Sequence, residues 1–526
     1  MTSISHIQAN ASAKEPTPFG MLERFTGLPR RRVGLVIPPS PFLLDERVFV
    51  SLGILKVAAS LETAGHDVSV VDLAGVQNYT EAFEAYLKNT DAEVLGFTST
   101  TPQLPAAFAL AAVAERARPD LRRILGGPHV TLTHSAVKLE NRLKRQNGRA
   151  SFALDRLRQA FHVLCSGDGE VAVLQAVQPD APAIVDGDDR KGGLFMNDDF
   201  YETTPAPARH LVDMASYHYT IEGHDATSLI AQLGCPFNCG FCGGRNSNSL
   251  RVIRTRSIES IVEELEHLHR TYGYTGFMFY DDELNVNPSL VELMNAISDL
   301  QERLGVSFRL RGFVKSELFT DQQAEAMYRA GFRWLLCGFE AAHPRILQNM
   351  QKRATRDDNT RAVGIAKRHG LKVKALMSIG HPGESDETAF AIRQWLEEMA
   401  VDDFDCTIIT TYPGTPYYDM SVPHETQPGV WTYTARTGDR LHAREVDFST
   451  TADFYKGIPG GGYQAFVFTD HLSSEELIAT RDAIEADVRK KLNIPFNPSR
   501  PAVQFEHSMG QGLPDFILRK STGAIP

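Results

Sequence analysis

The chain has 526 residues, of which 42% are hydrophobic and 23% are charged, as in ordinary folded proteins. At roughly 150 residues per domain, this length suffices for about three domains with cores of their own. The net charge of −11 argues against general binding to nucleic acids, which needs a basic surface. Only six cysteines occur, which excludes a disulfide scaffold, and no run of about 18 uncharged apolar residues predicts a membrane span.

Residues 1–30 lack the apolar core of a signal peptide and predict a disordered or extended lead-in. From 31 to 180, strand and helix patterns alternate. Strands are predicted at 33–37, 67–73, 93–98, 122–126 and 161–166, with helices near 50–63, 80–88 and 103–117. This order predicts an α/β domain with a doubly wound, Rossmann-like parallel sheet, which binds ligands at the carboxyl ends of its strands.

Residues 181–225 are rich in Asp and Pro and predict an extended linker. A second alternating series occupies 226–420. Its strands are predicted at 227–233, 275–280, 306–311, 333–339, 372–379 and 404–410, with helices near 257–272, 288–303, 320–330, 358–369 and 385–399. Six repeats predict a partial (β/α)6 barrel, since the complete eight-stranded form usually needs about 250 residues. Residues 421–526 lose the periodicity and predict a small, loop-rich α+β domain with a helix at 475–491.

Three cysteines lie close together directly after the first strand of the second series. Cys235, Cys239 and Cys242 have the spacing C-x3-C-x2-C. Three thiolates on one loop can face one centre, and soft sulfur ligands suit zinc or iron–sulfur. No fourth ligand of a structural zinc site follows, so one coordination position is left for a substrate or cofactor. A zinc knuckle or unrelated cysteines remain the alternative, and the other three cysteines are predicted to be buried structural thiols.

This loop, with Phe241 just before its last cysteine, resembles that of the radical S-adenosylmethionine (SAM) enzymes. Further stretches that end predicted strands match the methyltransferase-like subfamily (class B) with an N-terminal cobalamin-binding domain. In the barrel they are 279–282 (FYDD), 338–340 (GFE), 379–384 (IGHPGE) and 412–416 (YPGTP). In the first domain they are 38–39 (PP), 65–68 (GHDV), 126–129 (GGPH) and 167–170 (GDGE). The resemblance spans about residues 31–420 and implies three cofactors: a [4Fe–4S] cluster, SAM and cobalamin.

The resemblance also assigns residues of the barrel to cofactors. The three cysteines would hold the cluster, and SAM would chelate its remaining iron. Phe241 is expected near the adenine, and Gly380 in a turn that offers backbone groups to the adenine. Asp281 or Asp282 would meet the SAM amino group, with capping or a salt bridge at the barrel mouth as the alternative. Glu340 would accept a hydrogen bond from the ribose or the amino group.

In the first domain the resemblance assigns residues to cobalamin. It places Thr98, Ser99 and Thr101 beneath the corrin, and it also assigns Pro38 to cobalamin binding. It places Gly126, Gly127, Gly167 and Glu170 near the nucleotide tail. The motif Asp-x-His-x-x-Gly, which supplies an axial histidine, is absent, so no cobalt ligand is assigned. A vestigial cobalamin domain remains an alternative.

The function that the resemblance implies is methylation of an unactivated carbon, or of phosphorus, in a small metabolite. It would use methylcobalamin and a 5′-deoxyadenosyl radical, with an electron donor such as flavodoxin or ferredoxin. Alternatives are cyclisation, ring contraction or oxidation without methyl transfer, and a non-catalytic cobalamin-binding or redox-sensing protein. Unpaired cysteines fit a reducing cytoplasm. Substrate specificity is expected in the segment after residue 420, and the sequence assigns neither a catalytic residue nor an oligomeric state.

Overall fold

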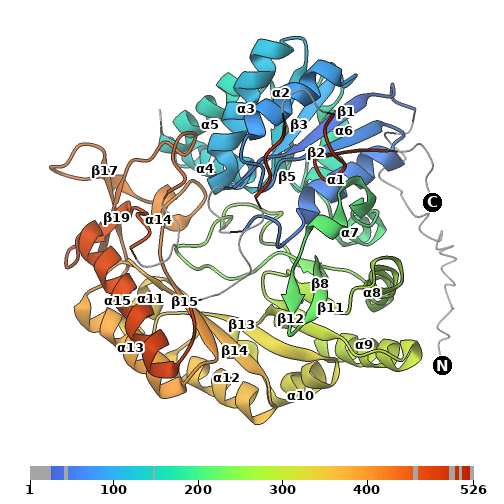
Figure 1. Cartoon of the computed structure of the whole chain (residues 1–526). Coiled ribbons are helices and arrows are strands. Elements are labelled where there is room, and N and C mark those ends of the chain that lie inside the picture. Colours follow the sequence, from blue (N-terminus) through green and yellow to red (C-terminus); the bar gives the residue numbers. More distant parts are fainter. Residues whose placement is uncertain are drawn as a thin grey trace, which may run out of the picture.

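The computed structural model describes residues 25, 27–40, 45–145, 148–453, 460–496, 504–508 and 512–521. Two large parallel sheets with flanking helices face each other across the molecule, and a small antiparallel sheet lies at one side (Figure 1). Most of the predicted lead-in, 1–30, falls outside the described residues. None of the helices in the described parts of the chain combines the length and apolar composition needed to cross a membrane.

The first domain contains the predicted doubly wound sheet. Its parallel strands lie in the order β2-β1-β3-β4-β5-β6. They are β1 (Arg32–Ile37), β2 (Asp67–Asp72), β3 (Val94–Thr98), β4 (Arg122–Gly126), β5 (Val163–Gly167) and β6 (Ile184–Gly187). All five predicted strands are confirmed, and β6 lies in the stretch expected to be a linker. A short strand from the chain end, β20 (Leu518–Lys520), pairs antiparallel with β2.

Helices cover both faces of this sheet. On one face are α1 (Leu52–Thr63) and α6 (Gly169–Ala176), whose core continues into the barrel. On the other are α2 (Tyr79–Asn89), α3 (Leu104–Ala117) and α5 (Arg149–Ala160), which share a separate core. The sequence did not predict α4 (Pro128–Arg142), α5 or α6. In α4, β-branched Val and Thr residues and a mostly polar composition weaken the helical pattern.

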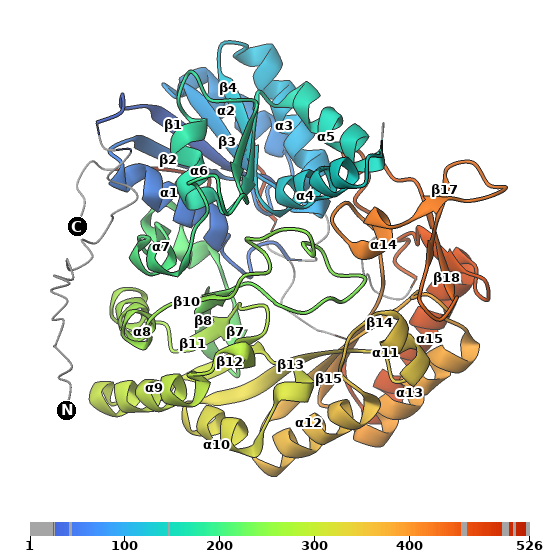
Figure 2. The ribbon, with the colours of Figure 1, turned by 180° about the vertical axis from the view of Figure 1, so that it is seen from behind.

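The second domain is an open half-barrel of six parallel strands in chain order, as predicted. They are β8 (His224–Leu229), β11 (Gly276–Phe279), β12 (Arg309–Phe313), β13 (Phe332–Glu340), β14 (Lys372–Ile379) and β15 (Asp403–Ile408). Its helices include α8 (Ile258–Tyr272), α9 (Leu290–Leu304), α10 (Asp321–Arg329), α11 (Pro344–Asn349), α12 (Arg356–Arg368) and α13 (Asp386–Met399). Of these, α8, α9, α10, α12 and α13 lie outside the strands when the molecule is seen from behind (Figure 2). At the edge of the sheet formed by β8, the short strand β7 (Thr220–Ile221) pairs antiparallel with β8.

The cysteines belong to a hairpin rather than to the first barrel strand. The predicted strand 227–233 ends at Leu229, and β9 (Gln232–Leu233) pairs antiparallel with β10 (Arg254–Thr255). The residues between them form the cysteine hairpin, 234–253. Both of its ends are therefore fixed at the carboxyl end of β8, where the barrel opens.

The C-terminal region is more regular than the sequence predicts. It forms a four-stranded antiparallel sheet of β16 (Val422–Pro423), β17 (Val430–Thr434), β18 (Arg440–Arg444) and β19 (Val467–Thr469). It follows a short helix, α14 (Pro416–Asp419), and precedes α15 (Ser474–Leu492), which begins with a capping box of Ser473 and Glu476.

Side chains of α15 cover the last strand of the half-barrel. Glu485 accepts a hydrogen bond from the backbone N–H of Cys406 at 2.6 Å, and Arg481 donates to the carbonyl of Cys406 at 2.9 Å. Arg489 donates to the carbonyl of Phe404. Unpaired backbone groups at a sheet edge are costly when buried. Helix α15 thus closes the edge that an incomplete barrel leaves open.

Candidate functional site

Backbone contacts fix the cysteine hairpin over the mouth of the half-barrel. Gly234 has φ +88°, and a side chain there would clash with the carbonyl of Val252. At the centre, Gly240 donates to the carbonyl of Met350 at 2.8 Å and accepts from the backbone N–H of Tyr417 at 3.0 Å. The ring of Tyr417 occupies the space where a side chain at Gly240 would lie. The loop is therefore held from two sides.

Arg245 brings a positive charge to the three cysteines. It donates to the carbonyls of Cys235 at 3.2 Å, of Gly243 at 3.2 and 3.3 Å, and of Phe237. Burial raises the pKa of the Cys242 thiol to about 12, and the charge of Arg245 acts against that rise. A thiol in this environment ionises when a metal binds it, since coordination deprotonates thiols outright.

The donor set of the cysteine hairpin fits an iron–sulfur cluster. In the described residues, no three His, Cys, Asp or Glu side chains converge closely enough to share a single metal ion. A cubane cluster binds each cysteine to a different iron, so it needs thiolates that are spread around it. Cys235, Cys239 and Cys242 supply three such ligands from one loop, and no fourth cysteine joins them. Cys165, Cys337 and Cys406 are buried in strands, as predicted.

Glu340 ends β13 in a strained backbone conformation beside the cysteine hairpin. Its φ is +66°, and the register with β14 shifts at this point. Its carboxylate lies 3.4 Å from the ammonium of Lys352 and accepts from Ser378 Oγ at 2.9 Å. A side chain at Gly338 would come within 2.6 Å of this carboxylate, which explains the glycine of the GFE motif. Burial lowers the pKa of Lys352, but Glu340 and Cys239 outweigh this and hold it above its ordinary value.

A neutral histidine extends this network below the loop. His381 is fully buried, and burial lowers its pKa to about 3. Its ring nitrogens lie 2.8 Å from Ser378 Oγ and 3.3 Å from the hydroxyl of Tyr417. The ring of Phe241 meets that of His381 edge-on at 5.3 Å. Phe241 thus lies on the side of the cysteine hairpin that faces His381. Gly380, with a φ of +89°, belongs to the same turn as His381.

The two acids after β11 have different surroundings. Asp281 is buried and accepts from the backbone N–H groups of Ala231 and Gln232 at 3.1 and 2.5 Å. This geometry favours the capping alternative for Asp281, whereas Asp282 is exposed at the barrel mouth. The sequence did not single out Glu283. Burial raises its pKa to about 7 against the charges of Lys352 and Lys315, and its place in the run Asp-Asp-Glu was the available signal.

The first domain contains a cavity of about 640 Å³. Five of the residues expected to bind cobalamin line it: Thr98, Gly126, Gly127, Gly167 and Glu170. The other three make contacts within their loops. The carbonyl of Pro38 accepts from Gln103 at 2.9 Å, Ser99 Oγ donates to the carbonyl of Thr100 at 2.7 Å, and Thr101 Oγ1 lies 3.0 Å from His129 Nδ1.

The lining of this cavity fits a flat organic group with a polar tail. It extends along β1, β3, β4 and β5, and it includes the point between β1 and β3 where the strand order reverses and doubly wound sheets bind ligands. The floor is apolar, with Leu35, Ile54, Val57, Ile124, Cys165 and Val173. Cavities of this size bind drug-sized ligands through an apolar lining and a few polar groups. The nucleotide tail of cobalamin, an aromatic base joined to ribose and phosphate, meets this description.

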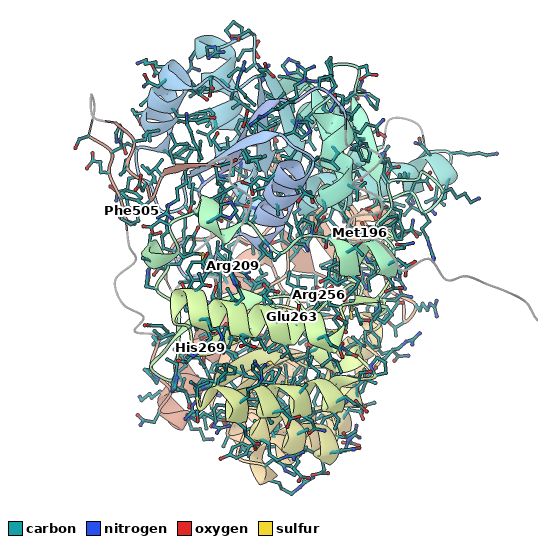
Figure 3. All side chains as sticks on the ribbon, turned by 90° about the vertical axis from the view of Figure 1, so that its right-hand side faces the viewer. Met196, Arg209, Arg256, Glu263, His269 and Phe505 are labelled. Carbon is teal, nitrogen blue, oxygen red and sulfur yellow. The ribbon has the colours of Figure 1, made fainter. Side chains whose placement is uncertain are left out.

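The far wall of the cavity comes from segments that the sequence did not implicate. Tyr201, Thr204 and Arg209 belong to the predicted linker, and Arg256 and Glu264 belong to the barrel. Glu264 on α8 accepts from Arg209 at 2.7 Å and also pairs with Arg256. Figure 3 shows both arginines above α8, between that helix and the first domain. The cavity is therefore completed by the barrel.

Hydrogen bonds dock the cysteine hairpin on the first domain. Asp188, directly after β6, accepts from Ser247 Oγ at 2.7 Å and from the N–H and hydroxyl of Ser249, each at 2.8 Å. Arg254, which is fully buried, pairs with Asp168 after β5. The carboxyl ends of the first sheet thus hold the loop that carries the thiols.

Comparisons with known proteins agree with both halves of this site. The Radical SAM superfamily model matches residues 229–396, and the B12 binding domain model matches residues 46–142. An uncharacterized methyltransferase of Pyrococcus horikoshii is 28% identical over 404 residues, 74% of this chain and 83% of that protein. An anaerobic magnesium-protoporphyrin IX monomethyl ester cyclase of Rubrivivax gelatinosus is 23% identical over 367 residues, which are 65% of this chain and 62% of that protein.

A solved structure has the same fold. It is the radical SAM methyltransferase TsrM of Kitasatospora setae, with cobalamin and a [4Fe–4S] cluster bound. The TM-score is 0.57 at 17% identity, with 78% of this chain and 81% of that chain covered.

Proposed function

The chain belongs to the radical SAM enzymes that carry a B12-binding domain, with a [4Fe–4S] cluster, SAM and cobalamin as cofactors, and from this we propose that it is a methyltransferase. Its acceptor would be an unactivated carbon, or phosphorus, of a small molecule. The observation that carries the proposal is the docking of the cysteine hairpin on the first domain through Asp188 and Arg254. It joins the cluster ligands to the domain that holds the corrinoid.

When bound, the cluster supplies the electron that cleaves SAM, and cobalamin carries the methyl group. Cys235, Cys239 and Cys242 would hold the cluster, and Arg245 would offset their negative charge. Glu340 would accept a hydrogen bond from SAM, while Ser378 and Lys352 orient its carboxylate. Burying a charge is costly unless it is paired, so this support lets a carboxylate act as acceptor at a partly enclosed site.

Water is excluded from the inner side of the loop by aromatic rings. The ring of His381 meets those of Phe241 and Tyr417 edge-on beneath the cysteine hairpin. Because His381 stays neutral at physiological pH, it adds no charge that would repel the positive sulfonium of SAM. We propose that Asp282, exposed at the barrel mouth, meets the amino group of SAM, since Asp281 is occupied by backbone N–H groups.

The C-terminal sheet would contribute to substrate selection from a fixed position. Asp439 precedes β18 and accepts from Arg345 Nε and Asn349 Nδ2, each at 2.7 Å. These residues belong to α11, beside the end of β13. The sheet is thus held against the loops at the barrel mouth.

The proposal is tested with SAM that carries a labelled methyl group and no added substrate. Anaerobically reconstituted enzyme with cobalamin and a reductant is expected to release S-adenosylhomocysteine and to retain the label on its bound corrinoid. Production of 5′-deoxyadenosine without transfer of the label would overturn methyl transfer and favour cyclisation or another radical reaction. Retention of cobalamin with neither product would favour a non-catalytic binding protein.

A further inference from the structure

Lys56 is a half-buried cation in the cavity of the first domain. It lies in the second turn of α1 and lines the cavity. Its ammonium donates to Thr204 Oγ1 at 2.6 Å and to the carbonyl of Pro205 at 2.8 Å, both of which are neutral acceptors. An ammonium has three N–H donors, so one remains for a ligand.

Two arginines that line the cavity each have a carboxylate partner, in contrast to Lys56. Arg209 and Arg256 both pair with the buried Glu264. Among the described residues, Lys56 forms no ion pair, although Glu170 is close enough to act on its charge. Burial lowers the pKa of Lys56 to about 8, so it is still protonated at neutral pH. A buried cation is costly without a charged partner, and an anionic ligand would provide one.

Residues of the linker hold the Lys56 ammonium in position for such a ligand. Thr204 and Pro205 follow α7 (Asp198–Thr203), and the Tyr201 ring of that helix has its centroid 5.8 Å from the ammonium. Together they hold a long, flexible side chain in one place, which lowers the entropy lost on binding. The cofactor for this cavity carries one fixed negative charge on its nucleotide tail, the phosphodiester. The apolar floor suits the base of that tail, and Lys56 suits its phosphate.

We propose that Lys56 is the positioning residue for the phosphodiester of the cobalamin nucleotide tail, and that through it the protein selects corrinoids with an intact tail. The inference rests on the B12-binding assignment and is independent of whether the enzyme transfers a methyl group. A charge-assisted hydrogen bond of this kind corresponds to about a tenfold to hundredfold difference in affinity.

The test compares three corrinoids by anaerobic absorbance titration of the full-length protein. Cobalamin has base, ribose and phosphate, cobinamide phosphate keeps only the phosphate, and cobinamide lacks all three. Lys56→Gln is expected to weaken binding of the first two about tenfold to hundredfold and to leave cobinamide unchanged. Lys56→Arg, which keeps the charge, is expected to restore most of the affinity. Lys88→Gln, at an exposed lysine paired with Glu84, is the matched control without effect.

Three results would overturn the inference. Equal weakening for all three corrinoids would show that Lys56 acts through folding. Weakening for cobalamin alone would assign Lys56 to the base or ribose. Wild-type affinity of Lys56→Gln for cobalamin would remove Lys56 from the site. A wild-type protein that binds no corrinoid would overturn the cofactor assignment itself, whereas failure of methyl transfer with these affinities intact would leave Lys56 in its role.

Discussion

The cysteine hairpin of the barrel and the cavity of the first domain differ in how they bind a cofactor. The hairpin uses three side chains of one residue type at fixed spacing, all on one loop. The cavity encloses its ligand by shape. Glycines and apolar residues of four strands and two helices form most of it, and the linker and α8 provide one wall. Ligation by thiolates depends on a few atoms, whereas enclosure of a large organic group depends on many small contributions. Single substitutions should therefore act in an all-or-none way at the hairpin and by degrees in the cavity.

The largest effect is expected for Cys239→Ala. Loss of one of three cluster ligands should abolish SAM cleavage and lower the iron and sulfide content, while the affinity for cobalamin stays at the wild-type value. Anaerobic absorbance spectra, metal analysis and chromatography of 5′-deoxyadenosine measure these quantities. Cys337→Ala is the control, because that thiol is buried within β13 and should leave the cluster intact. SAM cleavage by Cys239→Ala at the wild-type rate would refute the cluster assignment.

A graded but still large effect is expected at Glu340. Replacement by Gln removes the charge from a hydrogen bond to SAM, which should weaken SAM binding about tenfold or more. It also leaves the buried ammonium of Lys352 without its ion-pair partner. Isothermal titration with SAM measures the affinity. The double variant Glu340→Gln/Lys352→Met separates the causes, since recovery of SAM binding would mean that the unpaired charge, and not the lost acceptor, was responsible.

The three cysteines of the hairpin are easier to recognise in the sequence than the residues of the cavity, for the same physical reason. Local apolar patterns indicate strands β1 and β13, and the spacing of three cysteines is local too. The pairing of β20 with β2 joins residues 518–520 to residues 69–71, and nothing local signals it. Likewise Thr204 and Arg209 looked like linker residues, although folding places them in the cavity wall. Contacts between segments that are distant in sequence produce no periodic pattern of residues from which they could be predicted.

Substitutions at two adjacent glycines of the cavity distinguish an effect on cavity shape from an effect on folding stability. Gly127 has φ +96° and ψ 179°, and a side chain would lie 2.8 Å from the backbone nitrogen of Ser99. Gly127→Ala should therefore destabilise the first domain by about 1–3 kcal/mol, seen as a lower Tm. A side chain at Gly126 would meet Cys165 Cβ at an ordinary 3.5 Å, so Gly126→Ala should keep the Tm. Its methyl group narrows the cavity and should weaken cobalamin binding about fivefold. Equal Tm values for both variants would contradict this distinction.

The smallest expected effect is a dependence of cobalamin affinity on pH. The lowered pKa of Lys56, about 8, means that the free protein loses this charge as the pH rises through that value. Between pH 7.5 and 8.5 the dissociation constant should rise about threefold, since only the protonated form binds the phosphodiester. Glu170 and Glu264 act to raise this pKa, and Arg209 and Arg256 to lower it. Asp168, also in the lining, has a pKa raised by burial to about 7, so titrations begin at pH 7.5. Because arginine stays charged throughout this range, Lys56→Arg should show a flat profile, as should cobinamide with the wild-type protein. A threefold change that persisted for cobinamide would assign the titrating group elsewhere in the cavity.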